Sequence, residues 1–462
     1  MSTTLRFAQQ HHELLRRHMF PGDGNEAIAL VLCGRREGAD RRVLTAREVV
    51  LVPYHECSVR TPDRVVWSTD ILDRLIPKIW TSGLSILKIH SHPGGYERFS
   101  ALDDESDAAL SVSFDGLFSE GRLHGSAVML PDGSMFGREM IGGRVGNDFR
   151  AVMIAGDDIR FWCRGNFNPF GEDDLRNRQA FGAGTVNLLR SLRVAVIGCS
   201  GTGSIVIEQL ARLGVGAFVL VDPDIIEVKN LNRIPNSTLE DADRRTPKVM
   251  VAKRMVDALG RGQSVLPLQM NLDSVEAVHR VAECDVIFGC VDTAEGRNLA
   301  NRIAAYYLIP YIDTGVRLVA DGQGGVETIA GAVNYCKPGG ATLLERGAIT
   351  SEQIRAEEVR RTDPDRYHEL RRQKYILGVE EERPAVISIN AFFAALAVNE
   401  FLARVHVFRN VDNSAFSTVR GDLCEFALCR EPEEGSKGHF LKELGLGDCE
   451  PLIGRPSLSV RP

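Results

Sequence analysis

Two histidines and an aspartate in the first quarter of the chain have the spacing of a catalytic metal site. One residue separates His90 from His92, and Ser100 and Asp103 follow. The stretch 86–90 has the pattern of a strand, on which side chains two residues apart point to the same face. Both imidazoles can therefore reach one ion, with Asp103 as a third ligand. Such a set leaves the fourth position of a tetrahedral zinc ion to water, whose pKa zinc lowers to about 7.

This pattern of histidines, serine and aspartate resembles that of the JAB/MPN metalloproteases. These isopeptidases cut ubiquitin-like proteins from their targets or trim their precursors. The resemblance covers about residues 1 to 150 and implies an α+β domain in which His90, His92 and Asp103 hold zinc. It also implies that Ser100 helps to hold the oxyanion of the tetrahedral intermediate, as a hydroxyl donor aimed at developing charge would.

The same family needs a glutamate, early in the domain, as a general acid/base. Glu26 directly precedes an apolar, strand-like run at 27–34 and is the candidate. Glu48 and Glu56 remain alternatives, because nothing in their local sequence distinguishes a catalytic carboxylate.

A second motif, about 100 residues downstream, has the pattern of a nucleotide-binding βαβ unit. The expected strand, glycine turn, helix and second strand are 193–197, 198–204, 205–213 and 217–221, with Gly198, Gly201 and Gly203 in the turn and Asp222 at the end. In such a unit the helix N-terminus faces phosphates and the acid reaches ribose hydroxyls. The dinucleotide fingerprint requires glycine where this chain has Ser200, which disfavours a nicotinamide oxidoreductase.

The segment from Asp222 to Arg233 resembles the signature of the enzymes that adenylate ubiquitin-like proteins. These include ubiquitin-activating enzymes and the bacterial adenylyltransferases of molybdopterin and thiamine synthesis. The resemblance spans about residues 170 to 410 and implies a Rossmann-like, doubly wound α/β domain that binds ATP and Mg²⁺. It implies that the glycine turn and Asp222 hold ATP, that Asn230, Arg233 and Lys248 hold phosphates, and that Asp292, after a buried strand at 285–291, binds Mg²⁺.

Adenylation of a carboxylate is an attack on the α-phosphorus of ATP with loss of pyrophosphate. Cationic side chains and Mg²⁺ must spread the charge while the protein does little covalent chemistry. In homodimeric members of the family, an arginine before a glutamine reaches into the partner's ATP site. Arg178, followed by Gln179, matches it, and we therefore expect a homodimer.

Cys336 is the candidate for covalent catalysis. Eukaryotic-type activating enzymes pass the adenylate to a cysteine between the Mg²⁺-binding aspartate and a late apolar helix, and Cys336 is the one cysteine between Cys290 and Cys424. Lys337 beside it could favour the thiolate, the form that attacks. The alternative is that Cys336 is the remnant of a lost zinc site and that the enzyme stops at the adenylate.

Length and composition agree with two enzymatic domains. The chain has 462 residues, enough for several sizeable cores. We expect a JAB/MPN domain at 1–150, a connector and first helix at 151–184, the adenylation domain at 185–410, and an extension of unknown role at 411–462. Within the adenylation domain, we expect a solvated charged helix at 350–372 and a buried apolar helix at 385–398.

The charge and the cysteine content limit the classes of partner and the cellular compartment that we expect. A net charge of −7 with no basic run argues against nucleic acid or an anionic membrane as the main partner. The longest apolar stretch is too short to span a bilayer. Ten scattered cysteines without a Cys-x-x-Cys pair indicate free thiols, and we therefore expect a cytoplasmic protein.

Together these features predict a bifunctional enzyme of a bacterial ubiquitin-like conjugation system. One domain would release or expose the C-terminal glycine of a small ubiquitin-like protein, and the other would adenylate it. A ubiquitin-conjugating-type protein would be a further partner. The main alternative is sulfur-carrier activation, in which the adenylate becomes a thiocarboxylate and the protease trims the carrier. A nicotinamide oxidoreductase and a non-catalytic scaffold are weaker alternatives.

Overall fold

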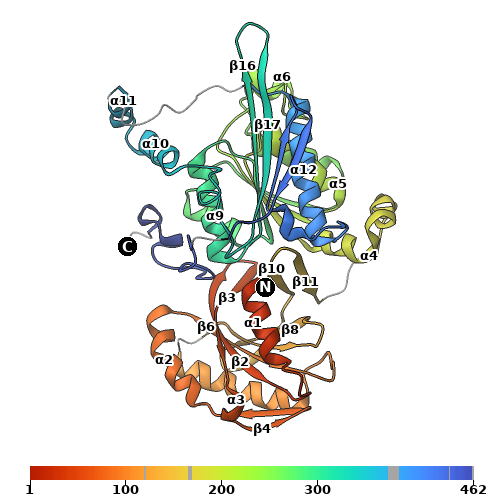
Figure 1. Cartoon of the computed structure of the whole chain (residues 1–462), viewed down its shortest axis with the longest axis vertical. Helices are drawn as coiled ribbons and strands as arrows, with labels where there is room; N and C mark the ends of the chain where they lie inside the picture. The colour runs from red at the N-terminus through yellow and green to blue at the C-terminus, as the bar shows by residue number, and fades with distance from the viewer. Residues whose placement is uncertain (119–120, 165–168, 373–383, 436–437, 460–462) are drawn as a thin grey trace. The chain divides into compact units, whose positions relative to one another are not determined.

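The chain forms two units in the computed structural model, which describes residues 1–118, 121–164, 169–372, 384–435 and 438–459 (Figure 1). Unit 1 comprises Met1–Phe167, Tyr306–Leu308 and Glu443–Pro462. Unit 2 comprises Asn168–Ala305 and Ile309–Lys442. Each unit is built on its own mixed sheet, which confirms the predicted α/β class.

Unit 1 is built on a nine-stranded sheet of order β11-β10-β1-β3-β2-β6-β7-β8-β9. Its strands are β1 (Ser2–Ala8), β2 (Ile28–Glu37), β3 (Arg41–Leu51), β6 (Ser85–Ser91), β7 (His124–Met129), β8 (Met135–Ile141), β9 (Arg144–Asp148), β10 (Ala151–Ala155) and β11 (Ile159–Cys163), and β4 (Cys57–Thr61) and β5 (Arg64–Trp67) form a separate hairpin. The helices are α1 (Gln9–Met19), α2 (Asp70–Ser82) and α3 (Ala101–Leu117).

Residues of β2 and β6 alternate between two cores, as the strand period requires. Ile28 and Leu30 belong to an apolar cluster that contains Ile79 of α2 and Phe114 of α3. Ala29 and Val31, between them in sequence, belong to a second cluster that contains Leu15 of α1. Helices therefore cover both faces of the central strands, and β6 lies buried between β2 and β7.

Unit 1 begins at Met1 as predicted but contains residues beyond the predicted range 1–150. Residues 151–163 were predicted to belong to a connector, but they form β10 and β11, of which β10 pairs in parallel with β1 and is buried throughout. The C-terminal segment returns to the same unit, where the Thr45 hydroxyl donates to the Gly445 carbonyl at 2.8 Å. Residues 400 apart in sequence make this contact, and no local pattern predicts it. Residues 165–168 of the expected connector lie outside the described residues.

Unit 2 is built on an eight-stranded sheet of order β14-β13-β12-β15-β16-β17-β18-β19. Its strands are β12 (Arg193–Ile197), β13 (Ala217–Val221), β14 (Ser264–Leu268), β15 (Val286–Gly289), β16 (Tyr311–Ala320), β17 (Val326–Cys336), β18 (Thr418–Asp422) and β19 (Ala427–Glu431). The pairs from β14 to β16 are parallel, and those from β16 to β19 are antiparallel. The strand order reverses at β12 and β15, where open α/β sheets bind ligands at the carboxyl ends of the strands.

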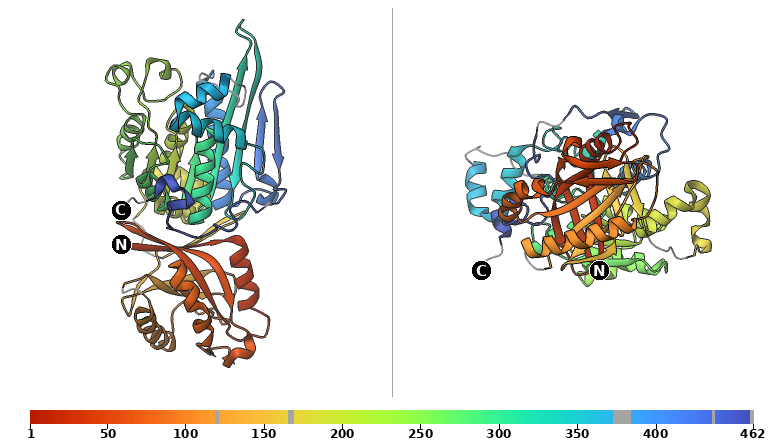
Figure 2. Two further views of the ribbon diagram at one scale, coloured as in Figure 1. Left: turned by 90° about the vertical axis from the view of Figure 1, so that its left-hand side faces the viewer. Right: turned by 90° about the horizontal axis from the view of Figure 1, so that it is seen from below.

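The helices of unit 2 are α4 (Leu175–Ser191), α5 (Gly201–Leu213), α6 (Leu239–Asp243), α7 (Lys248–Ala258), α8 (Val275–Ala282), α9 (Ala294–Tyr307), α10 (Ser351–Thr362), α11 (Pro364–Arg372) and α12 (Ile387–Val405), of which α9 ends in residues assigned to unit 1. The β16–β17 hairpin extends beyond its neighbours (Figures 1 and 2). Strands β18 and β19 continue the sheet of unit 2 past residue 410, where the second domain was predicted to end.

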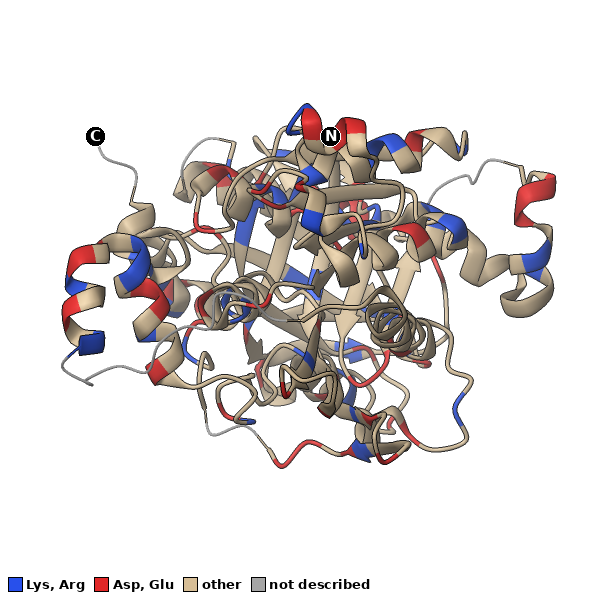
Figure 3. Cartoon of the chain, turned by 90° about the horizontal axis from the view of Figure 1, so that it is seen from above, with Lys and Arg blue, Asp and Glu red and all other residues tan. Residues whose placement is uncertain are grey.

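Two helix predictions in unit 2 can be compared directly with the structure. The charged segment 350–372 forms α10 and α11, which are mostly exposed, as expected. The apolar segment forms α12, which packs on α5, β16 and β17 with Phe393 and Phe401 fully buried. By length and composition alone α12 could cross a membrane, but 56% of its apolar window is buried within the protein, as in the core helix of many globular folds. Acidic and basic residues are interspersed over the ribbon in Figure 3.

Candidate metal centre and nucleotide site

A capping box fixes the aspartate of the candidate metal centre. Ser100 is the N-cap of α3, and its hydroxyl oxygen accepts the N–H of Asp103 at 3.2 Å. In return, the Asp103 carboxylate accepts the backbone N–H and the hydroxyl of Ser100, each at 2.7 Å. This reciprocal pattern begins the helix and holds the carboxylate in one orientation.

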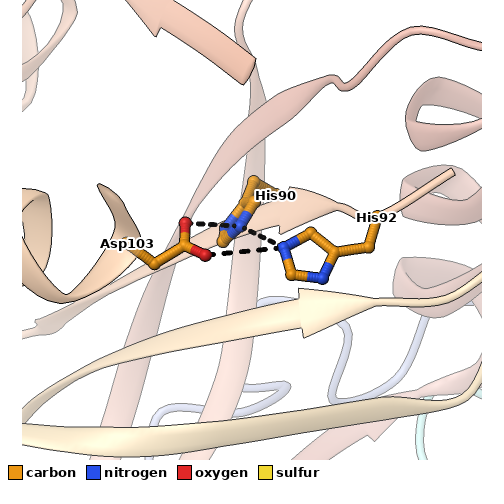
Figure 4. A group of neighbouring side chains, drawn as sticks. All are labelled: His90, His92 and Asp103. Atoms are coloured by element: carbon orange, nitrogen blue, oxygen red, sulfur yellow. Dashed lines mark hydrogen bonds and ion pairs between the residues drawn. The ribbon is translucent and has the colours of Figure 1, made fainter. Parts of the chain in front are cut away.

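Two imidazoles meet this carboxylate (Figure 4). The Nε2 atoms of His90 and His92 lie 3.0 Å apart, and they lie 2.9 and 3.5 Å from the two carboxylate oxygens of Asp103. Ligands around a tetrahedral zinc ion, each about 2.0–2.1 Å from it, are about 3.3 Å from one another. The Nδ1 atom of His92 lies 2.7 Å from the Tyr96 carbonyl oxygen, which orients Nε2 toward the centre. The predicted ligand set therefore fits zinc.

The protonation of His90 and Asp103 is also suited to binding a cation, whereas hydrogen bonds with Asp103 and Tyr96 outweigh burial and raise the pKa of His92. Burial lowers the pKa of His90, which favours the neutral imidazole that coordinates metals. Burial alone would raise the pKa of Asp103, but hydrogen bonds from His90, His92 and Ser100 hold it well below its ordinary value. Asp103 is therefore a carboxylate at any physiological pH.

Glu26 is the predicted glutamate that belongs to this centre electrostatically. It is buried just before β2, and burial raises the pKa of its carboxyl to about 7, with His92 and Asp103 among the charges that act on it. Glu48 and Glu56 instead form ion pairs with Lys78 and Arg74 of α2. Of the three glutamates, only Glu26 has the burial and electrostatic surroundings expected of a proton-transfer group.

The glycine turn of unit 2 joins β12 to α5. Gly198 has φ +89°, and a Cβ on Gly203 would lie 1.8 Å from the Gly198 carbonyl oxygen, so both positions require glycine. Ser200, at the N-cap of α5, has φ −87° and ψ −150°, an extended conformation open to any residue. The departure from the glycine-rich pattern at Ser200 therefore leaves the turn intact.

Asp222 follows β13 and lies against this turn. Its buried carboxylate accepts the N–H of Cys199 at 2.7 Å and that of Asp224 at 2.9 Å. Burial raises the pKa of Asp222, while Lys248 acts to lower it. The acid and the glycine turn thus meet at the carboxyl ends of β12 and β13, as the βαβ pattern predicts.

The predicted phosphate-binding residues surround the same edge of the sheet. Lys248, the first residue of α7, is buried, and its ammonium lies 2.7 Å from the Asp224 carboxylate. Arg233 has its Cδ atom 3.3 Å from the position of a Cβ on Gly201. Asn230 is buried and accepts the backbone N–H of Glu227 at 3.0 Å, while Asp292 is exposed after β15.

Comparisons with known proteins match each of the two units to a family. Residues 174–423 match the ThiF family model, and residues 8–139 match the model of prokaryotic homologs of the JAB domain. The chain belongs to the ThiF family. It combines a ThiF unit with a JAB-like unit, as predicted.

Individual relatives match only part of the chain. The SAMP-activating enzyme E1 of Haloferax volcanii is 36% identical over 27% of this chain and 45% of its own length. The sulfur carrier protein ThiS adenylyltransferase of Bacillus subtilis is 27% identical over 27% of this chain and 37% of its own length. A solved structure of Escherichia coli MccB with succinimide has a TM-score of 0.44 and 20% identity, covering 58% of this chain and 73% of that one. The matches thus span less than half the length of these two curated relatives.

The ThiF unit contains two further side chains at the site that sequence analysis missed. The Glu357 carboxylate of α10 accepts the N–H of Glu295 at 2.7 Å, in the first turn of α9, and Asp292 acts on it electrostatically. Asn390 of α12 has its amide nitrogen 2.2 Å from the position of a Cβ on Gly201. Both residues lie far along the chain from the motifs that they contact, so the tertiary fold is the only signal for them.

Arg178 lies in α4, whose helical geometry breaks at Gly182 (φ +76°, ψ +165°). Its guanidinium stacks 4.7 Å from the centre of the Phe170 ring. Within the single chain described, Arg178 is thus held by an aromatic ring, and its predicted role across a dimer interface stays a prediction.

Cys336 contradicts the expectation of a reactive thiolate. It is 1% exposed at the end of β17, and burial raises the pKa of its thiol to about 11. Lys337, expected to favour the thiolate, lies 3.3 Å from the Glu433 carboxylate. Cys336 pairs with Tyr311 at the start of β16, whereas the candidate ATP residues follow the carboxyl ends of β12, β13 and β15. Neither the position of Cys336 along the chain nor its neighbour Lys337 indicates this burial.

Proposed function

We propose that the ThiF unit adenylates the C-terminal glycine of a small ubiquitin-like protein with ATP and Mg²⁺. The observation that carries this proposal is the meeting of the glycine turn, Asp222 and Lys248 at the switch point of the sheet. A switch point with a helix N-terminus, an acid and cations suits a nucleoside triphosphate. By their names, one relative of this unit activates SAMP and another adenylates the sulfur carrier protein ThiS.

Each residue has a role that follows from its chemistry. Asp222 binds ribose hydroxyls, and the turn N–H groups face the phosphates. Lys248 and Arg233 offset the negative charge that develops as the glycine carboxylate attacks the α-phosphorus and pyrophosphate leaves. Asp292 would hold Mg²⁺, which supplies further charge neutralisation when bound.

ATP–pyrophosphate exchange with candidate small proteins ending in glycine tests this activity. Lys248→Met should abolish exchange. Lys253→Met is the matched control, because Lys253 lies in the same helix and pairs with Asp257 at 2.8 Å on the surface. Exchange that survives Lys248→Met would contradict the proposed phosphate role.

We infer for the JAB-like unit a zinc-dependent hydrolysis of peptide or isopeptide bonds that follow the glycine of the same small protein. The support is the His90, His92 and Asp103 set with the buried Glu26 beside it. Zinc, when bound, supplies a water that is acidic enough to react at neutral pH. Glu26 would carry a proton from the attacking water to the leaving group. The Ser100 hydroxyl donates to Asp103 in this structure, so it would turn from Asp103 to donate to the oxyanion.

Zinc content and cleavage of a glycine-extended precursor test the second activity. The purified chain should carry about one zinc ion in this unit, and His92→Ala should remove both the metal and the cleavage. His55→Ala is the control, because His55 is exposed in a short 3-10 helix (Tyr54–Glu56) of the same unit. Full cleavage by metal-free protein would refute the proposal.

Sulfur-carrier activation is the second candidate, and one observation favours it. Cys336 is buried with a raised pKa, which suits an enzyme that stops at the adenylate rather than forming a thioester. Incubation with the small protein and ATP separates the two pathways. A thiol-sensitive adduct on a non-reducing gel supports conjugation, while a thiocarboxylate detected by mass spectrometry after adding a sulfur donor supports carrier activation.

We propose a homodimer, with Arg178 acting in the partner's ATP site. Val407 and Phe408, which are 61% and 51% exposed, offer apolar surface for association. The neighbouring His406 hydrogen-bonds to Thr185 of α4 at 2.8 Å, so this surface adjoins the helix that carries Arg178. A ubiquitin-conjugating-type protein stays the proposed further partner. The cytoplasm stays the proposed compartment, since all ten cysteines lie in described residues and are thiols rather than disulfides.

A further inference from the structure

A buried charge cluster lies beside the candidate metal centre in unit 1. Lys88 of β6 is 4% exposed, Asp107 of α3 is fully buried, and Arg138 of β8 is 7% exposed. The Lys88 ammonium lies 2.5 Å from one oxygen of Asp107, and Arg138 donates to the other oxygen from Nε at 3.0 Å and from Nη2 at 2.7 Å. One carboxylate thus joins a helix to two strands of the sheet.

The same two elements carry the metal ligands. Lys88 precedes His90 by two residues on β6, so their side chains share a face of the strand. Asp107 follows Asp103 by four residues on α3, so theirs share a face of the helix. Two strand residues advance about 6.6 Å and four helix residues about 6 Å, so the two pairs match in spacing.

The observed contacts agree with this matched spacing. Lys88 meets Asp107 at 2.5 Å, and His90 meets Asp103 at 2.9 Å, with strand and helix running in opposite directions. Ile86, on the same face of β6, belongs to the apolar cluster that contains Phe114 of α3. A shift of α3 along β6 would therefore have two effects at once. It would break the Lys88–Asp107 pair, and it would move Asp103 away from the imidazoles.

We propose that Lys88 and Asp107 are positioning residues that set the register of α3 on β6 and so hold Asp103 at the metal centre. The inference rests on the proposed zinc function of this unit. A buried charge without its partner is strongly unfavourable, so the pair resists any register in which Lys88 and Asp107 separate. Arg138 adds a second restraint, since it also pairs with Asp104 of α3 and stacks 3.7 Å from the centre of the Phe99 ring.

Lys88→Met provides a test, because the positioning role and simple electrostatics predict opposite changes in zinc affinity. The cation of Lys88 acts on both Glu26 and His90, lowering the pKa of each. Its positive charge would also repel a dication directly, so by this repulsion alone its removal would strengthen the binding of the ion. If Lys88 positions Asp103, its removal instead weakens zinc binding by about 10- to 100-fold, the usual effect of losing an outer-shell partner.

The measurement is a zinc titration of the full chain against a chromogenic chelator, with His92→Ala identifying zinc bound elsewhere. Asp107→Asn should weaken zinc binding as Lys88→Met does. Glu139→Gln is the matched control, because Glu139 follows Arg138 on β8, is buried, and pairs with Arg42 at 3.6 Å. It should lower the melting temperature without changing zinc affinity.

The outcomes separate the inference from the proposed function. Weaker zinc binding in Lys88→Met and Asp107→Asn, but not in Glu139→Gln, supports positioning. Equal or tighter binding in Lys88→Met overturns it while leaving the metal centre intact. A wild-type chain without zinc at this site overturns both. If Lys88→Met does not fold, Lys88→Gln takes its place, because glutamine keeps a hydrogen-bond donor without the charge. The same decrease in zinc affinity is then expected.

Discussion

The backbone N–H of Cys199 donates a hydrogen bond to the Asp222 carboxylate at 2.7 Å, so the glycine turn and the ribose acid form one structural unit. Each oxygen of this carboxylate accepts one backbone N–H, from Cys199 or from Asp224, so Asp222→Asn leaves one of these N–H groups without an acceptor and removes the charge that would bind ribose hydroxyls. Hydrogen bonds to a charged group contribute about 1.5–3 kcal/mol, so we expect ATP–pyrophosphate exchange to fall about 10- to 100-fold.

The control for this variant is Asp243→Asn, since Asp243 is exposed on α6. Exchange should match the wild type in the control and fall only in Asp222→Asn. ATP affinity, measured by calorimetry, should fall in parallel. Unchanged ATP affinity in Asp222→Asn would show that the acid does not contact the nucleotide.

Glu26 should give metal-free protein a pH-dependent stability. Burial raises the pKa of its carboxyl from 4.5 to about 7, so the folded state binds this proton more tightly than the unfolded state. Stability from this residue is therefore complete at low pH and is lost as pH rises through about 7, by at most about 3 kcal/mol. The glutamine of Glu26→Gln cannot ionise. We therefore expect the variant to become more stable relative to the wild type as the pH rises from 5 to 8.

Thermal unfolding in the presence of a zinc chelator, at several pH values, checks this expectation. Glu48→Gln is the control, because Glu48 pairs with Lys78 in an exposed setting. The control should follow the wild-type pH profile. A Glu26→Gln profile parallel to the wild type would mean that Glu26 ionises as freely in the folded chain as in the unfolded one.

The sequence predicted the features that depend on neighbouring residues. The strand, turn, helix and strand from 193 to 222 form a local unit, and the pairing of Ser100 with Asp103 spans three residues. Residue type and spacing carry such information directly. The fold class and both candidate sites could therefore be predicted without coordinates.

Features that depend on distant contacts could not be predicted in this way. The C-terminal segment joins unit 1 through Gly445, and Glu357 reaches the first turn of α9 from a segment rich in similar acids. Lys88 and Asp107 are 19 residues apart and look like ordinary surface charges in the sequence. Burial of Cys336 depends on the packing of unit 2, so its motif position suggested a reactivity that its surroundings oppose.

Cys336 should react slowly with alkylating reagents. The thiolate is the reactive form, and burial with a pKa of about 11 leaves little of it at neutral pH. Cys424 and Cys429 are exposed on the β18–β19 hairpin and serve as internal controls. Iodoacetamide labelling of native protein, followed by mass spectrometry, should modify both controls well before Cys336. Labelling of Cys336 at a comparable rate would reopen a thioester role.

Arg178 and Asp292 should complement each other across the proposed dimer. If Arg178 serves the partner's ATP site, each composite site takes Arg178 from one chain and Asp292 from the other. Arg178→Ala and Asp292→Ala homodimers should each lose exchange activity. A mixed dimer retains one site with both residues. About half of the chains in an equal, freely exchanging mixture form such dimers, so roughly a quarter of the wild-type exchange should return.

Arg176→Ala is the control, since Arg176 hydrogen-bonds at 3.0 Å to Gln179 within its own helix. Sedimentation should show a dimer, and a monomer that still exchanges pyrophosphate would contradict the shared site.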